Sequence, residues 1–175
     1  VTEFKKEYTV ILSNGKKMQR VTRPVIPVRK SVKSGAVQTT PYGSFRVTAL
    51  AEGVEFKISV KDDKRGDYEA KTPWNGDGVE LFIDSRPFSG LDKGIYNDHV
   101  FRVFANPATK SHKASLSTSA NLDSSAIRWE IKEKGADYEA VMLIPWKSLK
   151  MNAPATLAFD IAVNDSDENK RISSI

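Results

Sequence analysis

The strongest constraint on this chain is a regular alternation of apolar and polar residues that recurs along most of its length. Residues 54–60 alternate without a fault, and residues 79–83, 138–144 and 157–163 repeat the same period of two. This period places apolar side chains on one face of a strand, whereas a helix needs a period of about 3.6 residues. The only helical candidate is the short turn at 145–149. The sequence therefore predicts an all-β protein.

Turn signals and tryptophans refine this prediction. Glu52-Gly53 lies between two alternating segments and predicts a hairpin, and Asn14-Gly15 predicts another near the start of the chain. Trp129 alternates in phase with two isoleucines, and Trp146 follows an Ile-Pro turn, so both are expected in the core. Many short strands separated by turns favour an antiparallel β-sandwich, jelly-roll-like in form.

The N-terminal part of the chain differs in charge from the remainder. Residues 1–35 hold nine Lys/Arg against two acidic residues, a net +7, whereas the whole chain carries +5. We expect residues 1–44 to form a basic segment, with a hairpin and an extended edge strand, packed on a β-sandwich of residues 45–175. A basic segment suits nucleic acid or an anionic glycan, but lysines also protect exposed strand edges. Because few aromatics interleave with these charges, nucleic-acid binding is not expected.

Several classes of site are excluded by composition. The chain has no cysteine, which removes disulfides, zinc–thiolate sites and a cysteine nucleophile. It has no run of about 18 apolar residues, so no membrane span is expected. It begins with Val1 and shows no signal peptide, so we expect a mature or trimmed chain whose compartment stays open.

The segment from Thr72 to Asp84 carries the features most typical of ligand binding. Trp74 lies in a polar, glycine-rich turn, and Glu80 follows six residues later among strand-forming residues. An exposed indole offers a flat face to the C–H face of a sugar ring, and a carboxylate accepts hydrogen bonds from its hydroxyls. The alternatives are a tryptophan that closes one end of the sandwich and an outward-facing charge on a strand.

Arg102 interrupts an otherwise apolar strand. Its planar guanidinium can donate to sugar hydroxyls or form a salt bridge with Glu80, and these roles are compatible.

The chain resembles the family 9 carbohydrate-binding modules in four motifs that follow one another in the same order. The matching segments are Trp74 to Asp84, Phe101 to Val103, Tyr138 to Leu149 and Phe159 to Asp165. The resemblance implies an antiparallel β-sandwich that binds sugars without catalysis, often at the reducing end of a glucan or xylan chain. It also implies that Trp74 stacks on the sugar ring while Glu80 and Arg102 bind its hydroxyls.

Two positions depart from the family pattern. Ala162 stands where the family places an amide ligand, and no aromatic residue follows Asn164-Asp165 to supply a second stacking surface. The loop aromatics Tyr68, Phe88 and Tyr96 are therefore candidates for that surface. The alternative function is a spacer or protein-interaction β-sandwich without a glycan site.

The acidic loops suggest a metal. Asp62 and Asp63 follow residues 54–60, and a second acidic group occupies residues 165–168. Calcium prefers such oxygen ligands, so we expect a structural calcium at Asp62 and Asp63, the alternative being solvated loop acids.

The chain itself is not expected to be an enzyme. A glycoside hydrolase needs two carboxylates about 5–9.5 Å apart, and no second glutamate has an aromatic setting like that of Glu80. The resemblance implies a module of a polysaccharide-degrading enzyme or a glycan-binding protein, located outside the cell, in the periplasm or at the cell surface.

Overall fold

The computed structural model describes residues 33–40, 42–68, 71–86, 98–152, 157–167 and 170–174. All of them belong to the second of two units into which the chain divides, residues 33–175. The predicted hairpin at Asn14-Gly15 and most of the predicted segment 1–44 lie outside these residues. The proposed boundary at residue 44 therefore stays a prediction.

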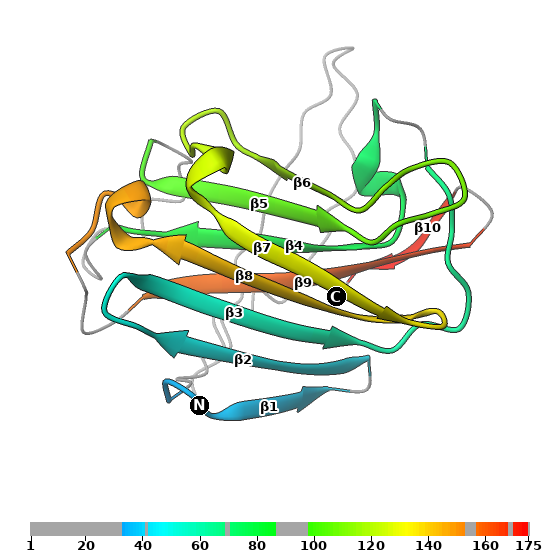
Figure 1. The fold of residues 1–175 in the computed structure, drawn as a ribbon, viewed down its shortest axis with the longest axis horizontal. Helices are drawn as coiled ribbons and strands as arrows, with labels where there is room; N and C mark the ends of the chain where they lie inside the picture. Colours follow the sequence, from blue (N-terminus) through cyan, green and yellow to red (C-terminus); the bar gives the residue numbers. More distant parts are fainter. Residues whose placement is uncertain are drawn as a thin grey trace, which may run out of the picture. The chain divides into compact units, whose positions relative to one another are not determined.

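The described strands form two antiparallel sheets (Figure 1). The first sheet contains, in spatial order, β1 (Val37–Thr40), β2 (Gly43–Ala49), β3 (Gly53–Val60), β8 (Asp137–Pro145) and β7 (Arg128–Lys134). The second contains β10 (Lys170–Ser174), β9 (Ala158–Asp167), β4 (Gly78–Asp84), β5 (Val100–Asn106) and β6 (Ser115–Thr118). Three short 3-10 turns are also described: η1 (Pro73–Asn75), η3 (Ser124–Ala126) and η4 (Trp146–Leu149). The predicted antiparallel β-sandwich is confirmed.

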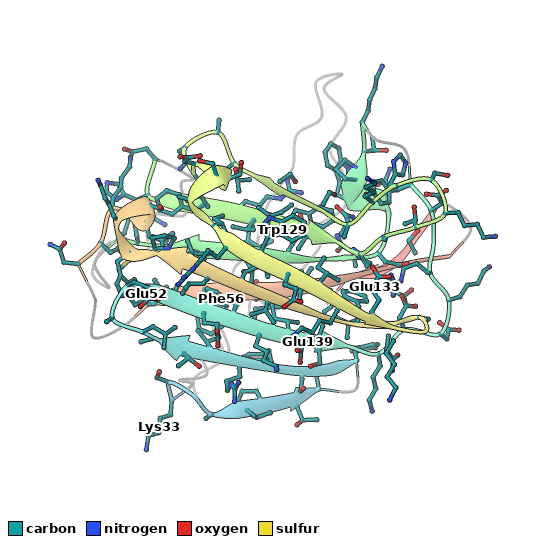
Figure 2. The ribbon with its side chains drawn as sticks, viewed as in Figure 1. Lys33, Glu52, Phe56, Trp129, Glu133 and Glu139 are labelled. Atoms are coloured by element: carbon teal, nitrogen blue, oxygen red, sulfur yellow. The ribbon has the colours of Figure 1, made fainter. Side chains whose placement is uncertain are left out.

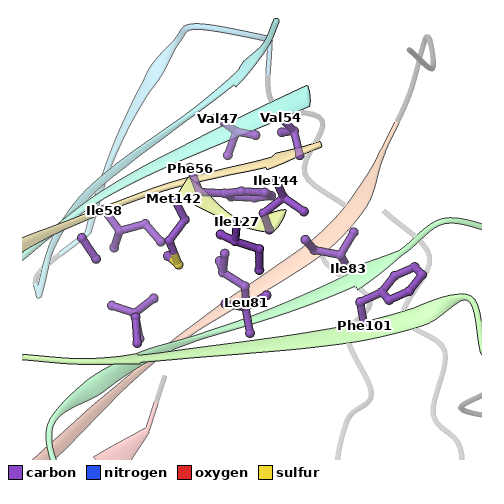
Figure 3. Close-up of a cluster of buried hydrophobic side chains, with 14 of the residues drawn as sticks. Val47, Val54, Phe56, Ile58, Leu81, Ile83, Phe101, Ile127, Met142 and Ile144 are labelled. Carbon is purple, nitrogen blue, oxygen red and sulfur yellow. The ribbon is translucent and has the colours of Figure 1, made fainter. Parts of the chain in front are cut away.

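The core lies between the two sheets, as the alternation predicts. On β3, Val54, Phe56 and Ile58 are buried while the residues between them face outward. On β4, Leu81 and Ile83 are completely buried. Figure 3 shows these side chains meeting from opposite sheets. Since apolar burial is the main favourable contribution to folding, this layer holds the sandwich together.

The predicted turns are confirmed where the structure describes them. The β2–β3 hairpin closes with a hydrogen bond from the Leu50 amide to the Gly53 carbonyl, 2.8 Å long. Trp146 begins η4, is 6% exposed, and donates its indole N–H to the Leu50 carbonyl at 2.9 Å. That side chain therefore closes the same end of the core as the hairpin.

The expectation that Trp129 is buried is wrong. Its side chain is 39% exposed on β7, although it pairs with the buried Met142 of β8. β7 is the last strand of its sheet, so only one side of the residue is covered by a neighbouring strand. Figure 2 shows Trp129 beside this edge strand. Alternation correctly gave its face of the sheet but could not show that the strand lies at the edge.

Candidate functional site

The predicted site begins with the one-turn helix η1, which carries Trp74. Proline at its first position fixes one backbone torsion and lacks an N–H that would otherwise go unpaired. The Asn75 amide donates to the Thr72 carbonyl at 2.9 Å, which closes the turn. Trp74 is 41% exposed, so its indole is open to solvent rather than buried in the sandwich.

Two asparagines of the second sheet hold this turn by its backbone. The side-chain amide of Asn106, on β5, donates to the carbonyls of Pro73 and Asp77 at 3.0 and 2.9 Å. The amide of Asn164, on β9, lies 3.4 Å from the Trp74 carbonyl. Both asparagines are 1% exposed. Because buried amides need partners, these bonds fix where the turn sits on the sheet.

Asp77 joins the end of the turn to two other segments. One carboxylate oxygen accepts the Gly66 amide at 2.6 Å, and the other accepts the Ser166 amide at 2.7 Å. The residue is 1% exposed. Burial is the largest cause that raises the pKa of Asp77, to about 7, while its two backbone hydrogen bonds oppose the shift.

Glu80 and Arg102 meet beside Trp74 on the outer face of the second sheet. Phe82 pairs with Arg102 across β4 and β5, so Glu80 and Arg102 are diagonal neighbours on one face. Arg102 Nη2 lies 2.5 Å from Glu80 Oε1, and the two side chains are 40% and 8% exposed. Arg102 Cζ is 5.9 Å from the Trp74 ring centroid. The structure thus brings three predicted site residues together from a turn and two strands.

This arrangement combines an apolar plane with an oriented ion pair. The indole provides a flat face, the guanidinium presents several donors, and the carboxylate is an acceptor. Asn164 Nδ2 lies 3.5 Å from the second Glu80 oxygen, which adds an amide to the group. Ala162 on β9 is the cross-strand partner of Glu80 on β4, so the side chain next to Glu80 on that strand is only a methyl group.

The other predicted sugar-contacting residues have different surroundings. Tyr68 is 7% exposed, its ring stacks on that of His112, and it lies against the backbone of Gly76. Tyr96 and the alternative Phe88 lie outside the described residues. Direct contact of these aromatics with a ligand stays a prediction.

The calcium prediction also stays untested. Asp62 accepts the Lys64 amide at 3.1 Å and lies 3.7 Å from Arg65 Nε, while Asp63 is exposed. Within the described part of the chain, no three His, Asp or Glu side chains converge as a metal-binding group. We retain calcium binding near Asp62 and Asp63 as a proposal that a calcium titration followed by thermal unfolding tests.

Sequence reasoning did not assign the residues that support the turn. Asn106, Asp77 and His112 were not predicted as part of the site. Asp77 lies three residues after Trp74 in the motif that carries the resemblance, which was the available signal. Asn106 and His112 had no local signal, because their partners lie 29 to 44 residues away in the chain.

The described strands define an antiparallel β-sandwich that carries this surface on its second sheet. The model of the family described as "Carbohydrate family 9 binding domain-like" matches residues 21–175. The chain belongs to this family, and it is accordingly a non-catalytic module rather than an enzyme. In the described residues, no helix is long and apolar enough to cross a membrane.

Individual relatives agree with this assignment. The chain is 27% identical over 139 residues to endo-1,4-beta-xylanase A of Thermotoga neapolitana, covering 79% of this chain and 12% of that protein. It is similar to a family 9 module from Caldicellulosiruptor kristjanssonii solved with glucose, with a TM-score of 0.61, 20% identity and coverage of 79% and 68% of the two chains. It is also similar to a family 9 module from the same organism solved with cellotriose, with a TM-score of 0.60 and 18% identity. That match covers 83% of this chain and 78% of the other chain. The two structures support the fold.

Proposed function

We propose that this chain binds the sugar ring of a glucan- or xylan-type oligosaccharide on the surface formed by Trp74, Glu80 and Arg102. The ring stacks on the exposed indole, and the ion pair exchanges hydrogen bonds with its hydroxyl groups. The observation that carries the proposal is the meeting of an indole 41% exposed with a Glu80–Arg102 pair 2.5 Å apart.

The chemistry of the surface supports a sugar over a purely apolar ligand. Sugar hydroxyls both donate and accept, and the surface offers a carboxylate, a guanidinium and a nearby amide. Small ligand sites typically combine an aromatic surface with a few placed polar groups. With only a few such contacts, the dissociation constant is expected to be about micromolar to millimolar. The relatives solved with glucose and cellotriose agree with this class of ligand.

Replacing Trp74 tests the proposal directly. Trp74→Ala should weaken cellotriose binding by about thirtyfold or more, because central aromatic residues contribute about 2 kcal/mol or more to such contacts. Isothermal titration calorimetry with glucose, cellotriose and xylotriose measures the effect. Trp129→Ala is the matched control, since that tryptophan is 39% exposed but lies on the other sheet.

Two results would contradict the proposed site. Equal losses of affinity in Trp74→Ala and Trp129→Ala would remove the special role of Trp74. Wild-type protein that binds no mono- or oligosaccharide would favour a spacer or protein-interaction domain.

We also propose that the chain works as one module of a larger polysaccharide-active protein found outside the cytoplasm. It spans 12% of the length of the matched xylanase, which leaves room for catalytic domains elsewhere in such a protein. A pull-down with insoluble xylan and cellulose tests whether the module alone attaches to a polymer. Fractionation of the source cells tests the location.

A further inference from the structure

The turn that carries Trp74 packs at Gly76 on the ring of Tyr68, which in turn stacks on His112. The rings of Tyr68 and His112 are stacked, with centroids 4.6 Å apart and planes inclined by 21°. His112 Nε2 lies 2.7 Å from the Tyr68 carbonyl oxygen. Because a carbonyl only accepts, Nε2 carries the hydrogen in this contact. The histidine therefore holds both the ring and the backbone of Tyr68.

The Tyr68 ring touches the Trp74 turn at Gly76. A β-carbon built at Gly76 would lie 2.5 Å from Tyr68 Cδ1 and 2.9 Å from its Cγ. Such distances are too short for any side chain, so the backbone of the turn lies directly against the ring. Glycine is needed here for close approach and not for an unusual backbone torsion, since φ at Gly76 is −97°.

The aromatic pair is itself fixed to the loop that follows β5. Asp67 accepts hydrogen bonds from the hydroxyls of Thr109, at 2.7 Å, and Ser111. These two bonds are the main reason that the pKa of Asp67 lies below its ordinary value. The Tyr68 hydroxyl lies 3.5 Å from Ser115 Oγ on β6. The loop that contains Asp67 and Tyr68 therefore meets the loop after β5, and the Trp74 turn packs on the Tyr68 ring at this junction.

We propose that Tyr68 and His112 are positioning residues that set the orientation of Trp74 and hence the affinity for sugar, without touching the sugar. For Tyr68, which is 7% exposed, this proposal replaces the direct sugar contact predicted from the sequence. This inference depends on the proposed function only for its affinity consequence. Asn106 and Asn164 hold the turn from the sheet, and Tyr68 limits its movement on the side of Gly76. Since Trp74 is 41% exposed, its own burial fixes the side chain only in part.

The different exposure of Tyr68 and Trp74 distinguishes a positioning role from direct contact with the sugar. Tyr68 is 7% exposed, so little of its ring is available to a ligand, whereas Trp74 is open. Replacing a residue that only stabilises the fold would lower the melting temperature without making the turn more mobile. Replacing a positioning residue must also increase the mobility of the Trp74 indole.

The experiment compares variants that remove a ring with one that keeps it. Tyr68→Leu and His112→Leu should each weaken cellotriose binding in calorimetry by about threefold to tenfold, the range expected from losing an aromatic pair. Tyr68→Phe keeps the ring and should stay within about twofold of wild type, since it loses only a long hydroxyl contact. Val47→Ala, a core change in the other sheet, should lower the melting temperature and leave affinity unchanged.

A second readout follows Trp74 without sugar. All proteins are prepared with Trp129→Phe, so that the emitting tryptophans are Trp74 and Trp146, which is 6% exposed. Acrylamide quenching should rise in Tyr68→Leu and His112→Leu and stay constant in Tyr68→Phe and Val47→Ala.

The outcomes distinguish this inference from the proposed function. If folded Tyr68→Leu and His112→Leu quench like wild type, the positioning role is overturned, whatever the affinity. If quenching rises but affinity is retained, the role in binding is overturned. If wild type binds no sugar, the proposed function fails together with the affinity consequence, while increased quenching still supports the positioning of Trp74.

Discussion

At the scale of single residues, the Glu80–Arg102 pair is an ion pair that also lies within the proposed sugar-binding surface. Glu80 is 8% exposed in its side chain, and its charge needs the guanidinium beside it. Arg102 is 40% exposed, so part of the same guanidinium still faces solvent next to the indole. The sequence left open whether Arg102 serves a salt bridge or a ligand, and this geometry is compatible with both.

Arg102→Lys separates these two roles. Lysine keeps the positive charge opposite Glu80 but loses the planar, multi-donor group, so sugar affinity should fall about tenfold with a small change in melting temperature. Calorimetry and thermal unfolding on the same samples measure both quantities. Arg128→Lys is the control, because the Arg128–Glu52 pair is 72% and 59% exposed and such pairs contribute little. An unchanged affinity in Arg102→Lys would place the guanidinium outside the binding contacts.

At the scale of elements, Asp77 connects the η1 turn and β4 to the loop after β3 and to β9. Both of its carboxylate oxygens accept backbone amides, from Gly66 and Ser166. The surroundings are acidic, since Asp62 and Asp165 each raise the pKa of Asp77 further. One side chain therefore joins three segments, at the cost of burying a charge near other charges.

This burial predicts a pH-dependent stability. The pKa of Asp77 is about 7 in the folded protein against 3.8 ordinarily, so the folded state holds a proton that the unfolded state releases between these values. The contribution of Asp77 to stability is therefore complete below about pH 4 and is lost as the pH rises toward 7. Asp77→Asn should make the free energy of unfolding less dependent on pH over this range. Urea unfolding at several pH values measures this dependence. Identical slopes in the variant and wild type would rule Asp77 out as the cause.

At the scale of the whole molecule, the core supports the site by keeping the two sheets together. Leu81 lies between Glu80 and Phe82 on β4, so the strand that presents Glu80 outward also supplies a completely buried leucine. The same alternation therefore builds the core and orients the site.

Leu81→Ala should lower the free energy of unfolding by about 2–5 kcal/mol, because it leaves a cavity between the sheets. Leu50→Ala is the control with the same residue type, and it should cost less because Leu50 is 36% exposed. The hydrogen bond that its carbonyl accepts from Trp146 does not involve the side chain. Chemical denaturation measures both. Similar losses in the two variants would mean that the space between the sheets is not the main source of stability.

Local patterns predicted much of this architecture and part of the site. The alternation at 54–60 and 138–144 gave β3 and β8, and the Pro-Trp sequence gave η4. The segment at 105–126, which has little pattern, contains the four-residue edge strand β6. The structure brings Trp74, Glu80 and Arg102 together, but their separation and exposure were not available from spacing. Their contact with a sugar stays a prediction.

The sequence alone determined which residues face the core along β3, β4, β8 and β9, because side-chain direction in a strand follows from local backbone geometry. Only the tertiary structure decided which strands lie at the edges, and hence that Trp129 is exposed. It also decided that Asn106, Asn164 and the Tyr68–His112 pair surround the Trp74 turn. Those contacts join residues far apart in the chain, and such pairings depend on how whole strands align in the sheets rather than on any local pattern.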